Sequence, residues 1–259
     1  MLRTRLTLLG TVLCAVAVQP ITQAQETPPP PAASAKAPAM VHAAKLADKV
    51  MVESLAYLRE VKDKESADSA ALRFVVDIGI IMGIGEYFDA VGATDDLMTP
   101  EMTENARALH ELEEDLYENK YYGSTLLAHA WDAYGEDSPK PTEEEKAAAI
   151  KKLDELDAKK IEDILASVKD RETADAAARA FAEKLAVHYL LTDAGYAPKE
   201  RQCIKMSNSE LRRFEELGRA AFYDSLLLSI IARELMFSHI QAAKSEPIPE
   251  VPQVLPPVE

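Results

Sequence analysis

The sequence predicts an all-α protein in which two pseudo-repeated helical-hairpin halves form a bundle or a short helical stack, with disordered proline-rich ends. The main observation is an internal repeat, because residues 61–71 (VKDKESADSAA) return 107 residues later as residues 168–178 (VKDRETADAAA). Eight of the eleven positions are identical, and so dense a match within one chain indicates duplication of a structural unit. Apolar residues with helical spacing around each copy, and prolines gathered near both ends, complete the prediction.

Each copy of the repeat is predicted to form a corner between two helices. The apolar pattern of the preceding helix stops at Asp63. Ser66 and Thr173 then offer hydroxyls that can accept hydrogen bonds from the unpaired backbone N–H groups of the next helix. Asp68 and Asp175 fall in the first turn of that helix, where the helix dipole favours negative charge. The apolar residues before the first corner, at steps of three and four, are Ala44, Ala47, Met51, Leu55, Leu58 and Val61.

A second, less dense similarity continues the repeat at an offset of 101 residues. A connector six residues shorter in the second half would reconcile the two offsets. The matched pairs are Leu116 with Leu217, Tyr121 with Phe222, Tyr122 with Tyr223, Ser124 with Ser225, Leu126 with Leu227, and Leu127 with Leu228.

The remaining elements follow from helical periodicity and from residues that start or stop helices. A threonine before proline at 99–100 and capping boxes at 142–145 and 207–210 indicate helix starts. Helices are expected at about 40–62, 66–91, 99–116, 121–134 with a bend near Gly123, 142–168, 173–192 and 207–244, with a polar connector at 193–206.

The chain is expected to be exported. Residues 1–24 combine two arginines, a 13-residue apolar core at Leu6–Val18 and a small-residue cleavage point, as a secretory signal peptide does. That core is too short to span a membrane, so the mature protein is expected in the periplasm or outside the cell. The expected segments are signal peptide 1–24, Pro/Ala-rich linker 25–39, first helical half 40–134, connector 135–141, second helical half 142–244 and disordered tail 245–259.

The chain is strongly acidic and its mature form has one cysteine. The sequence has 29 basic and 44 acidic residues, a formal charge of −15, and cleavage of the signal would remove two of the arginines. Such a charge repels nucleic acid and anionic lipid, so no nucleic-acid partner is expected. Cys14 would leave with the signal. Cys203 would then form an intermolecular disulfide in a homodimer, act as a reactive thiol, or be inert.

Residues 74–91 form the most apolar stretch after the signal. Asp77, Glu86 and Asp89 lie within it, and an acid near a bilayer centre costs about 2.5–3.5 kcal/mol. The matching part of the second half also contains charged residues. A buried helix is therefore preferred, and no membrane span is expected in the mature chain.

The repeated acids are the first candidates for a functional site. A calcium site needs six to eight oxygen ligands in a shaped loop, whereas Lys64 or Arg171 interrupts each cluster. Helix capping and solvation explain the acids better, so neither a metal nor another cofactor is expected. His110 precedes a glutamate as in zinc helices, but Glu114 stands where that pattern has its second histidine. The candidate acids are Asp63, Glu65, Asp68, Asp170, Glu172 and Asp175.

A ligand pocket is the second candidate. His129 and His188 fall on or beside apolar stripes, where a lone histidine is more often hydrogen-bonded within the core than bound to a ligand. Together with Tyr122 and Tyr223, they are the candidates to line a pocket between the halves. The sequence has no Ser-His-Asp order, glycine-rich phosphate loop or haem attachment motif, so an enzyme is the least favoured class.

The corner motif, Val-Lys-Asp-x-x-Ser/Thr-Ala-Asp-x-Ala-Ala, resembles one in uncharacterised exported bacterial proteins made of helical hairpins. The resemblance covers the two corners and their flanking helices. It implies an all-α fold and a location in the cell envelope, and it brings no activity, ligand or catalytic residue.

The sequence therefore favours a non-enzymatic, acidic helical protein of the cell envelope. Its expected role is that of a structural or protein-interaction module with an unidentified protein partner. The alternative is an extracytoplasmic carrier that binds a ligand or metal in a pocket between the helical halves.

Overall fold

The chain folds into helices wherever the structure describes it. The computed structural model describes residues 38–93, 99–133, 140–202 and 204–245, and these contain nine α-helices and no strand. The predicted all-α class is confirmed for these residues. The expected signal peptide, Cys203 and residues 246–259 lie outside them. The helices are α2 Pro38–Leu58, α3 Lys64–Ala90, α5 Pro100–Glu118, α6 Thr125–Ala130, α7 Glu143–Ala158, α8 Ile161–Ala166, α9 Arg171–Asp193, α10 Asn208–Arg219 and α11 Leu226–Ser245, with 3₁₀ segments η2 Lys120–Gly123, η3 Lys199–Arg201 and η4 Ala221–Asp224.

The two repeated corners have the same local geometry. Asp63 caps α3 with φ −153° and ψ 173°, and Asp170 caps α9 with φ −153° and ψ 177°. Each carboxylate accepts a hydrogen bond from the backbone N–H three residues on. The hydroxyl at that position, of Ser66 or Thr173, accepts from the backbone N–H of the aspartate. The prediction that these hydroxyls accept from the N–H groups opening the helix was wrong: each is the third helical residue of a capping box and accepts from the N–H of the aspartate before the helix, so both helices begin earlier than expected.

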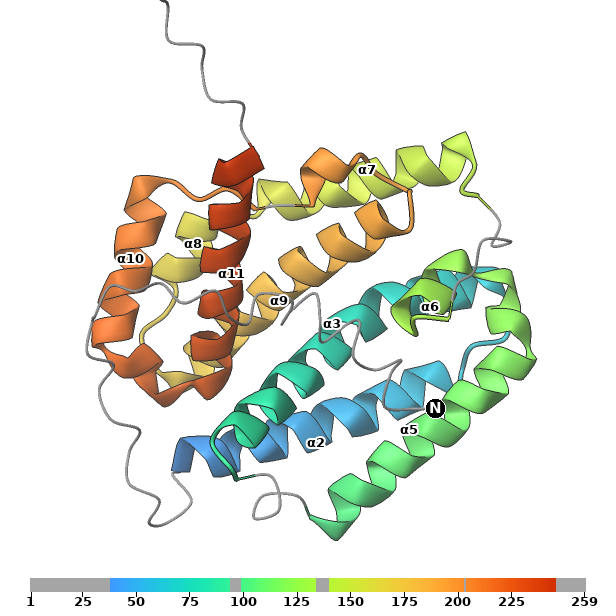
Figure 1. Cartoon of the computed structure of the whole chain (residues 1–259), viewed down its shortest axis with the longest axis horizontal. Helices are drawn as coiled ribbons and strands as arrows, with labels where there is room; N and C mark the ends of the chain where they lie inside the picture. Colours follow the sequence, from blue (N-terminus) through green and yellow to red (C-terminus); the bar gives the residue numbers. More distant parts are fainter. Residues whose placement is uncertain (1–37, 94–98, 134–139, 203, 246–259) are drawn as a thin grey trace, which may run out of the picture.

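α3 and α9 form an antiparallel pair at the centre of the molecule (Figure 1). The first half of α3 packs with the end of α9 in one hydrophobic cluster, and the start of α9 packs with the end of α3 in the other. Phe74 and Phe181 hold matching positions in these two clusters, and each is 0% exposed. Each half of the chain therefore builds its core partly from the central helix of the other half.

The chain reverses direction twice through a short left-handed turn. In η2, Tyr121 and Tyr122 have φ values of 50° and 52°, and in η4, Phe222 and Tyr223 have φ values of 51° and 52°. The residues on either side, at 120, 123, 221 and 224, also have positive φ. Left-handed backbone costs roughly 1–2 kcal/mol for each residue with a side chain. Contacts from elsewhere in the fold must therefore stabilise each turn.

These turns correct two sequence predictions. The helix expected at 121–134 is instead η2 followed by α6, which ends at Ala130. The single helix expected at 207–244 is instead α10, η4 and α11. In both places helical periodicity continues across the break, because the residues on either side pack into the core from two differently directed helices.

A buried serine holds each turn against the central pair. The Oγ of Ser124 donates to Asp68 Oδ1 of α3 at 2.5 Å, and the Oγ of Ser225 donates to Asp175 Oδ1 of α9 at 2.5 Å. Each serine also accepts from the backbone N–H three residues on, and so caps the helix that follows, α6 or α11. The repeated aspartates thus bind the repeated serines.

The apolar stretch of α3 is a buried helix. Within the described ranges of the chain, no helix is both long enough and apolar enough to cross a membrane. The carboxylate of Asp77 in α3 accepts hydrogen bonds from Ser54 at 3.1 Å and from Tyr57 at 3.0 Å. Burial raises the pKa of Asp77, and these two hydrogen bonds act against that rise.

Candidate functional site

A groove of about 800 Å³ opens between α3 and α5, beside the end of α6. One wall comes from α3, the other from the length of α5, and the residues that follow α6 close one end. Most of its lining is apolar: Met51, Ile78, Ile81, Met82, Ala106, Leu109, Tyr117, Tyr121, Ala130, Trp131 and Ala133.

Two aromatic residues, Tyr117 and Trp131, contribute to the apolar lining of the groove. Tyr117 is 61% exposed, which is unusual for a large side chain, and it packs edge-on against Tyr121 with ring centroids 6.3 Å apart. Trp131, the only tryptophan in the sequence, stacks on Phe74 with ring centroids 4.1 Å apart. The groove therefore offers apolar surface at its mouth and a rigid aromatic contact at its end.

The polar residues of the groove are almost all acidic. Glu113, Glu114 and Glu118 of α5 and Asp132 after α6 supply four carboxylates, and the lining that the structure describes has no lysine or arginine. Its one basic group is His110, whose Nδ1 lies 3.3 Å from Glu113 and whose Nε2 lies 3.7 Å from Glu114. An apolar groove with an acidic rim suits an apolar guest that carries positive charge.

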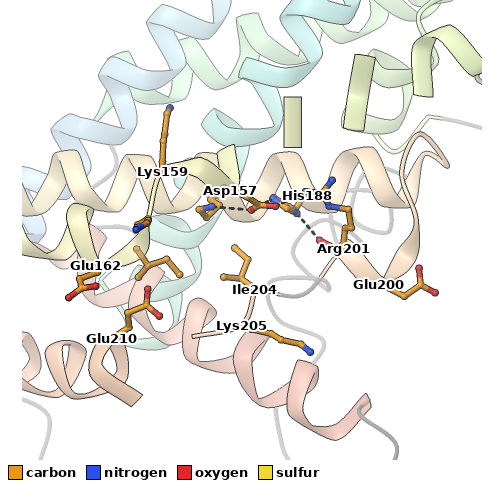
Figure 2. A pocket seen from close by; sticks show the side chains of 12 residues that line it. Asp157, Lys159, Glu162, His188, Glu200, Arg201, Ile204, Lys205 and Glu210 are labelled. Carbon is orange, nitrogen blue, oxygen red and sulfur yellow. Dashed lines mark hydrogen bonds and ion pairs between the residues drawn. The ribbon is translucent and has the colours of Figure 1, made fainter. Parts of the chain in front are cut away.

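A second pocket, of about 400 Å³, lies in the other half of the chain among α7, α9 and η3 (Figure 2). Its centre is Asp157, whose carboxylate accepts from Lys184 at 3.1 Å and from Arg201 at 2.6 Å. His188 Nε2 lies 3.1 Å from the same carboxylate, and its Nδ1 lies 2.7 Å from the backbone carbonyl oxygen of Arg201. The two ring nitrogens of His188 thus face two acceptor oxygens, one of the Asp157 carboxylate and one of the backbone.

This charged cluster is best explained as a clasp. Burial acts to raise the pKa of Asp157, but the hydrogen bonds from Arg201 and Lys184 outweigh it, so the pKa lies below its usual range. Arg201 comes from the connector after α9, whereas Asp157 ends α7. The cluster therefore fastens the connector to α7 and α9, and three of its basic groups are already engaged with one carboxylate.

The six candidate metal-binding acids have separate roles. Asp63 and Asp170 cap helices, and hydrogen bonds from Ser66 and Thr173 lower the pKa values of their carboxyls. Asp68 and Asp175 bind the two buried serines, and Glu65 and Glu172 are exposed. Among the described residues, no three side chains of His, Cys, Asp or Glu are grouped so that they could hold a metal ion.

The four candidate pocket residues lie apart. His188 lines the charged pocket, whereas His129 lies in α6 with its Nδ1 3.7 Å from the carboxylate of Asp193. Tyr122 and Tyr223 lie in the two left-handed turns. The groove is formed by elements of the first half and the charged pocket by elements of the second half.

Sequence reasoning missed the groove. The apolar spacing of α5 runs through Met102, Ala106 and Leu109 and predicts a buried stripe, but Ala106 is exposed and lines the groove. The available signal was Tyr117, an aromatic residue outside that stripe on an otherwise charged helix face. The extent of the groove depends on where α6 ends, which the periodicity did not indicate.

Comparison with protein-family models, with curated proteins and with solved structures finds no match. The proposed function therefore depends on the residues and geometry of this chain.

Proposed function

We propose that this chain is a non-enzymatic binding module of the cell envelope, built from two copies of one helical unit. Its α3–α5 groove would bind an apolar surface of another protein. The envelope location is an expectation from the N-terminal 24 residues, and the partner is a protein because the groove is long, open and bordered by charge.

Matched local geometry supports the two-copy architecture. The corners at Asp63 and Asp170 have the same backbone angles and the same capping box. The buried bonds of Ser124 and Ser225 have the same partner type, atom and length. Both copies also contain a left-handed turn at the same distance before that serine. Agreement at three separate features is difficult to explain without duplication.

The groove is the observation that carries the binding proposal. The apolar residues that line the groove are contiguous and include the exposed ring of Tyr117, whereas apolar residues scattered singly over a protein surface need no explanation. The exposed Tyr117 and the groove-facing Trp131 are of the residue types enriched at interface hot spots. The non-enzymatic part of the proposal comes from the charged pocket. The buried His188 and Lys184 both contact the Asp157 carboxylate, and among the described residues no nucleophile lies beside them.

Site-specific photocrosslinking tests this proposal. A photoreactive residue at position 117 should crosslink to a protein in the host envelope, whereas the same residue at position 52 of α2 should not. Val52 is the matched control, because it is 49% exposed and lies outside the groove lining. Ala106→Arg should abolish the crosslink from position 117, and Val52→Arg should leave it intact. Equal crosslinking from both positions, or crosslinking insensitive to Ala106→Arg, would refute the assignment of the groove.

The volume of the groove favours one alternative, a carrier of a small apolar molecule. About 800 Å³ falls within the roughly 300–1,000 Å³ range of small-molecule pockets. Native mass spectrometry of the protein isolated from its host would reveal a bound mass in that case. If Ala106→Arg removed this bound molecule and no protein crosslinked to position 117, the carrier would be favoured over the interaction module.

A further inference from the structure

We infer that the groove receives a basic amphipathic α-helix of the partner. The inference deepens the proposed function and rests on it. It follows from the place where α6 ends, and then from the length and the charge of the groove.

α6 and α11 begin in the same way but end differently. Each starts after a left-handed turn, is capped by a buried serine, and is tied through that serine to an aspartate of a central helix. α11 runs for 20 residues and packs on α9, α3, α2 and α10. α6 runs for only 6 residues. Within the described residues, α6 is therefore a much shorter counterpart of α11.

The groove begins where α6 ends. Ala130 and Trp131, at the end of α6, line it together with Ile78 and Tyr121. In the second half, the counterparts of Ile78 and Tyr121 are Leu185 and Phe222 at the 107- and 101-residue offsets. Both counterparts pack against the hydrophobic cluster that includes Ile231 and Leu235 of α11. Ile78 and Tyr121 are buried, at 7% and 4% exposed, whereas Leu185 and Phe222 are only partly buried, so the two halves bury these matching positions to different degrees.

The shape of the groove fits a helix of about three turns. Its wall on α5 extends from Ala106 through Leu109 and Glu113 to Tyr117 and Glu118. At about 1.5 Å per residue, this wall is about 18 Å long. The opposite wall, on α3, is about one turn long and presents Ile78, Ile81 and Met82 at steps of three and four. An elongated guest with one apolar face would lie along α5 and contact α3 over that turn, as in other helix-in-groove complexes.

The rim selects the charge of the guest. Four carboxylates line the groove, at positions 113, 114, 118 and 132. They add to the negative field of a chain whose formal charge is −15. A guest helix with lysine or arginine beside its apolar face would gain attraction at this rim, whereas an acidic guest would be repelled.

Trp131 fluorescence tests this inference on the purified mature chain, since it is the only tryptophan in the sequence. Three tryptophan-free 14-residue peptides serve as probes. Two present the same leucine face with lysine or glutamate flanks, and the third is the lysine peptide with its leucines scrambled around the helix. The lysine peptide should shift the emission of Trp131 and gain helical circular dichroism. It should bind about tenfold more tightly than the glutamate peptide, and added salt should narrow this ratio.

Ala106→Arg should weaken binding of the lysine peptide at least about tenfold, and Val52→Arg should leave it unchanged. Equal affinity for the lysine and glutamate peptides, or for the scrambled peptide, would overturn the inference. The inference would also be overturned if the emission of Trp131 changed with protein concentration and with none of the peptides. The groove would then be occupied by a second copy of this chain. If no peptide binds while the crosslink from position 117 persists, the helix inference fails alone. If neither peptide binding nor the crosslink from position 117 is observed, the helix inference and the proposed function both fail.

Discussion

Removal of the Ser225 hydroxyl should destabilise the protein far more than removal of an exposed helix cap. Ser225 is 1% exposed, caps α11, and donates to Asp175 at 2.5 Å. Loss of a cap costs about 1 kcal/mol, and loss of a hydrogen bond to a charged group costs about 1.5–3 kcal/mol. Asp175 keeps a second partner, because His42 Nε2 lies 2.7 Å from its other oxygen. The lower end of the sum applies, so Ser225→Ala should cost about 2.5 kcal/mol.

Urea unfolding followed by circular dichroism measures this difference. Ser207→Ala is the matched control, because the Ser207 hydroxyl also caps a helix, α10, but Ser207 is exposed and its hydroxyl has no aspartate partner. It should cost about 1 kcal/mol. Ser124→Ala should resemble Ser225→Ala, since Ser124 is 2% exposed and makes the matching bond.

Two results would refute the reasoning. If Ser225→Ala costs no more than Ser207→Ala, the bond to Asp175 adds nothing to the cap. If Ser124→Ala and Ser225→Ala differ by more than about 2 kcal/mol, the two copies do not hold their turns by the same contacts.

Three further predictions concern buried charge, backbone strain and acid stability. Asp77→Asn should be at least as stable as the natural protein at pH 7, because burial raises the pKa of this carboxyl and disfavours its charge. Asp77→Ala should lose about 1–3 kcal/mol, because it leaves the hydroxyls of Ser54 and Tyr57 without this acceptor. The urea unfolding midpoints of the two variants test both expectations. Gly123→Ala should cost about 1–2 kcal/mol at φ 77°, whereas Asp224→Gly, at φ 61° in the matching turn, should be neutral or stabilising in the same assay. Asp157 has a lowered pKa, so its contribution is present above its unfolded pKa of about 3.9 and is lost as pH falls through the folded value. Asp157→Asn should therefore lower stability at pH 7 and flatten the decline of stability below about pH 4, and an unchanged acid limb would count against the clasp.

Local signals made the helix starts predictable. The capping boxes at Thr142 and Ser207 and the start at Thr99 are formed by residues three positions apart or fewer, and the structure confirms all three. At the corners, the serine and threonine were recognised as caps, but the aspartate three residues earlier holds the N-cap position. As the third helical residue the hydroxyl accepts from the backbone N–H of the aspartate, whereas as an N-cap it would accept from N–H groups further along the helix.

Long-range contacts made the reversals and the groove unpredictable. Tyr121 and Tyr122 have no intrinsic preference for left-handed backbone, and the bond that supports their turn joins Ser124 to Asp68, 56 residues earlier. The sequence shows that both bonded residues recur in the second half, but not that they meet. The groove in turn depends on α6 ending at Ala130, so it could not be inferred before the turn was known.

Methyl NMR of the mature protein, titrated with the lysine-flanked peptide, tests the central claim most directly. The account predicts that the methyl resonances of Ile78, Ile81 and Met82 shift, since these residues line the groove. It also predicts that those of Ile161 and Ile204, which line the charged pocket in the other half, stay in place. Shifts confined to Ile161 and Ile204, or spread evenly over both halves, would contradict the account.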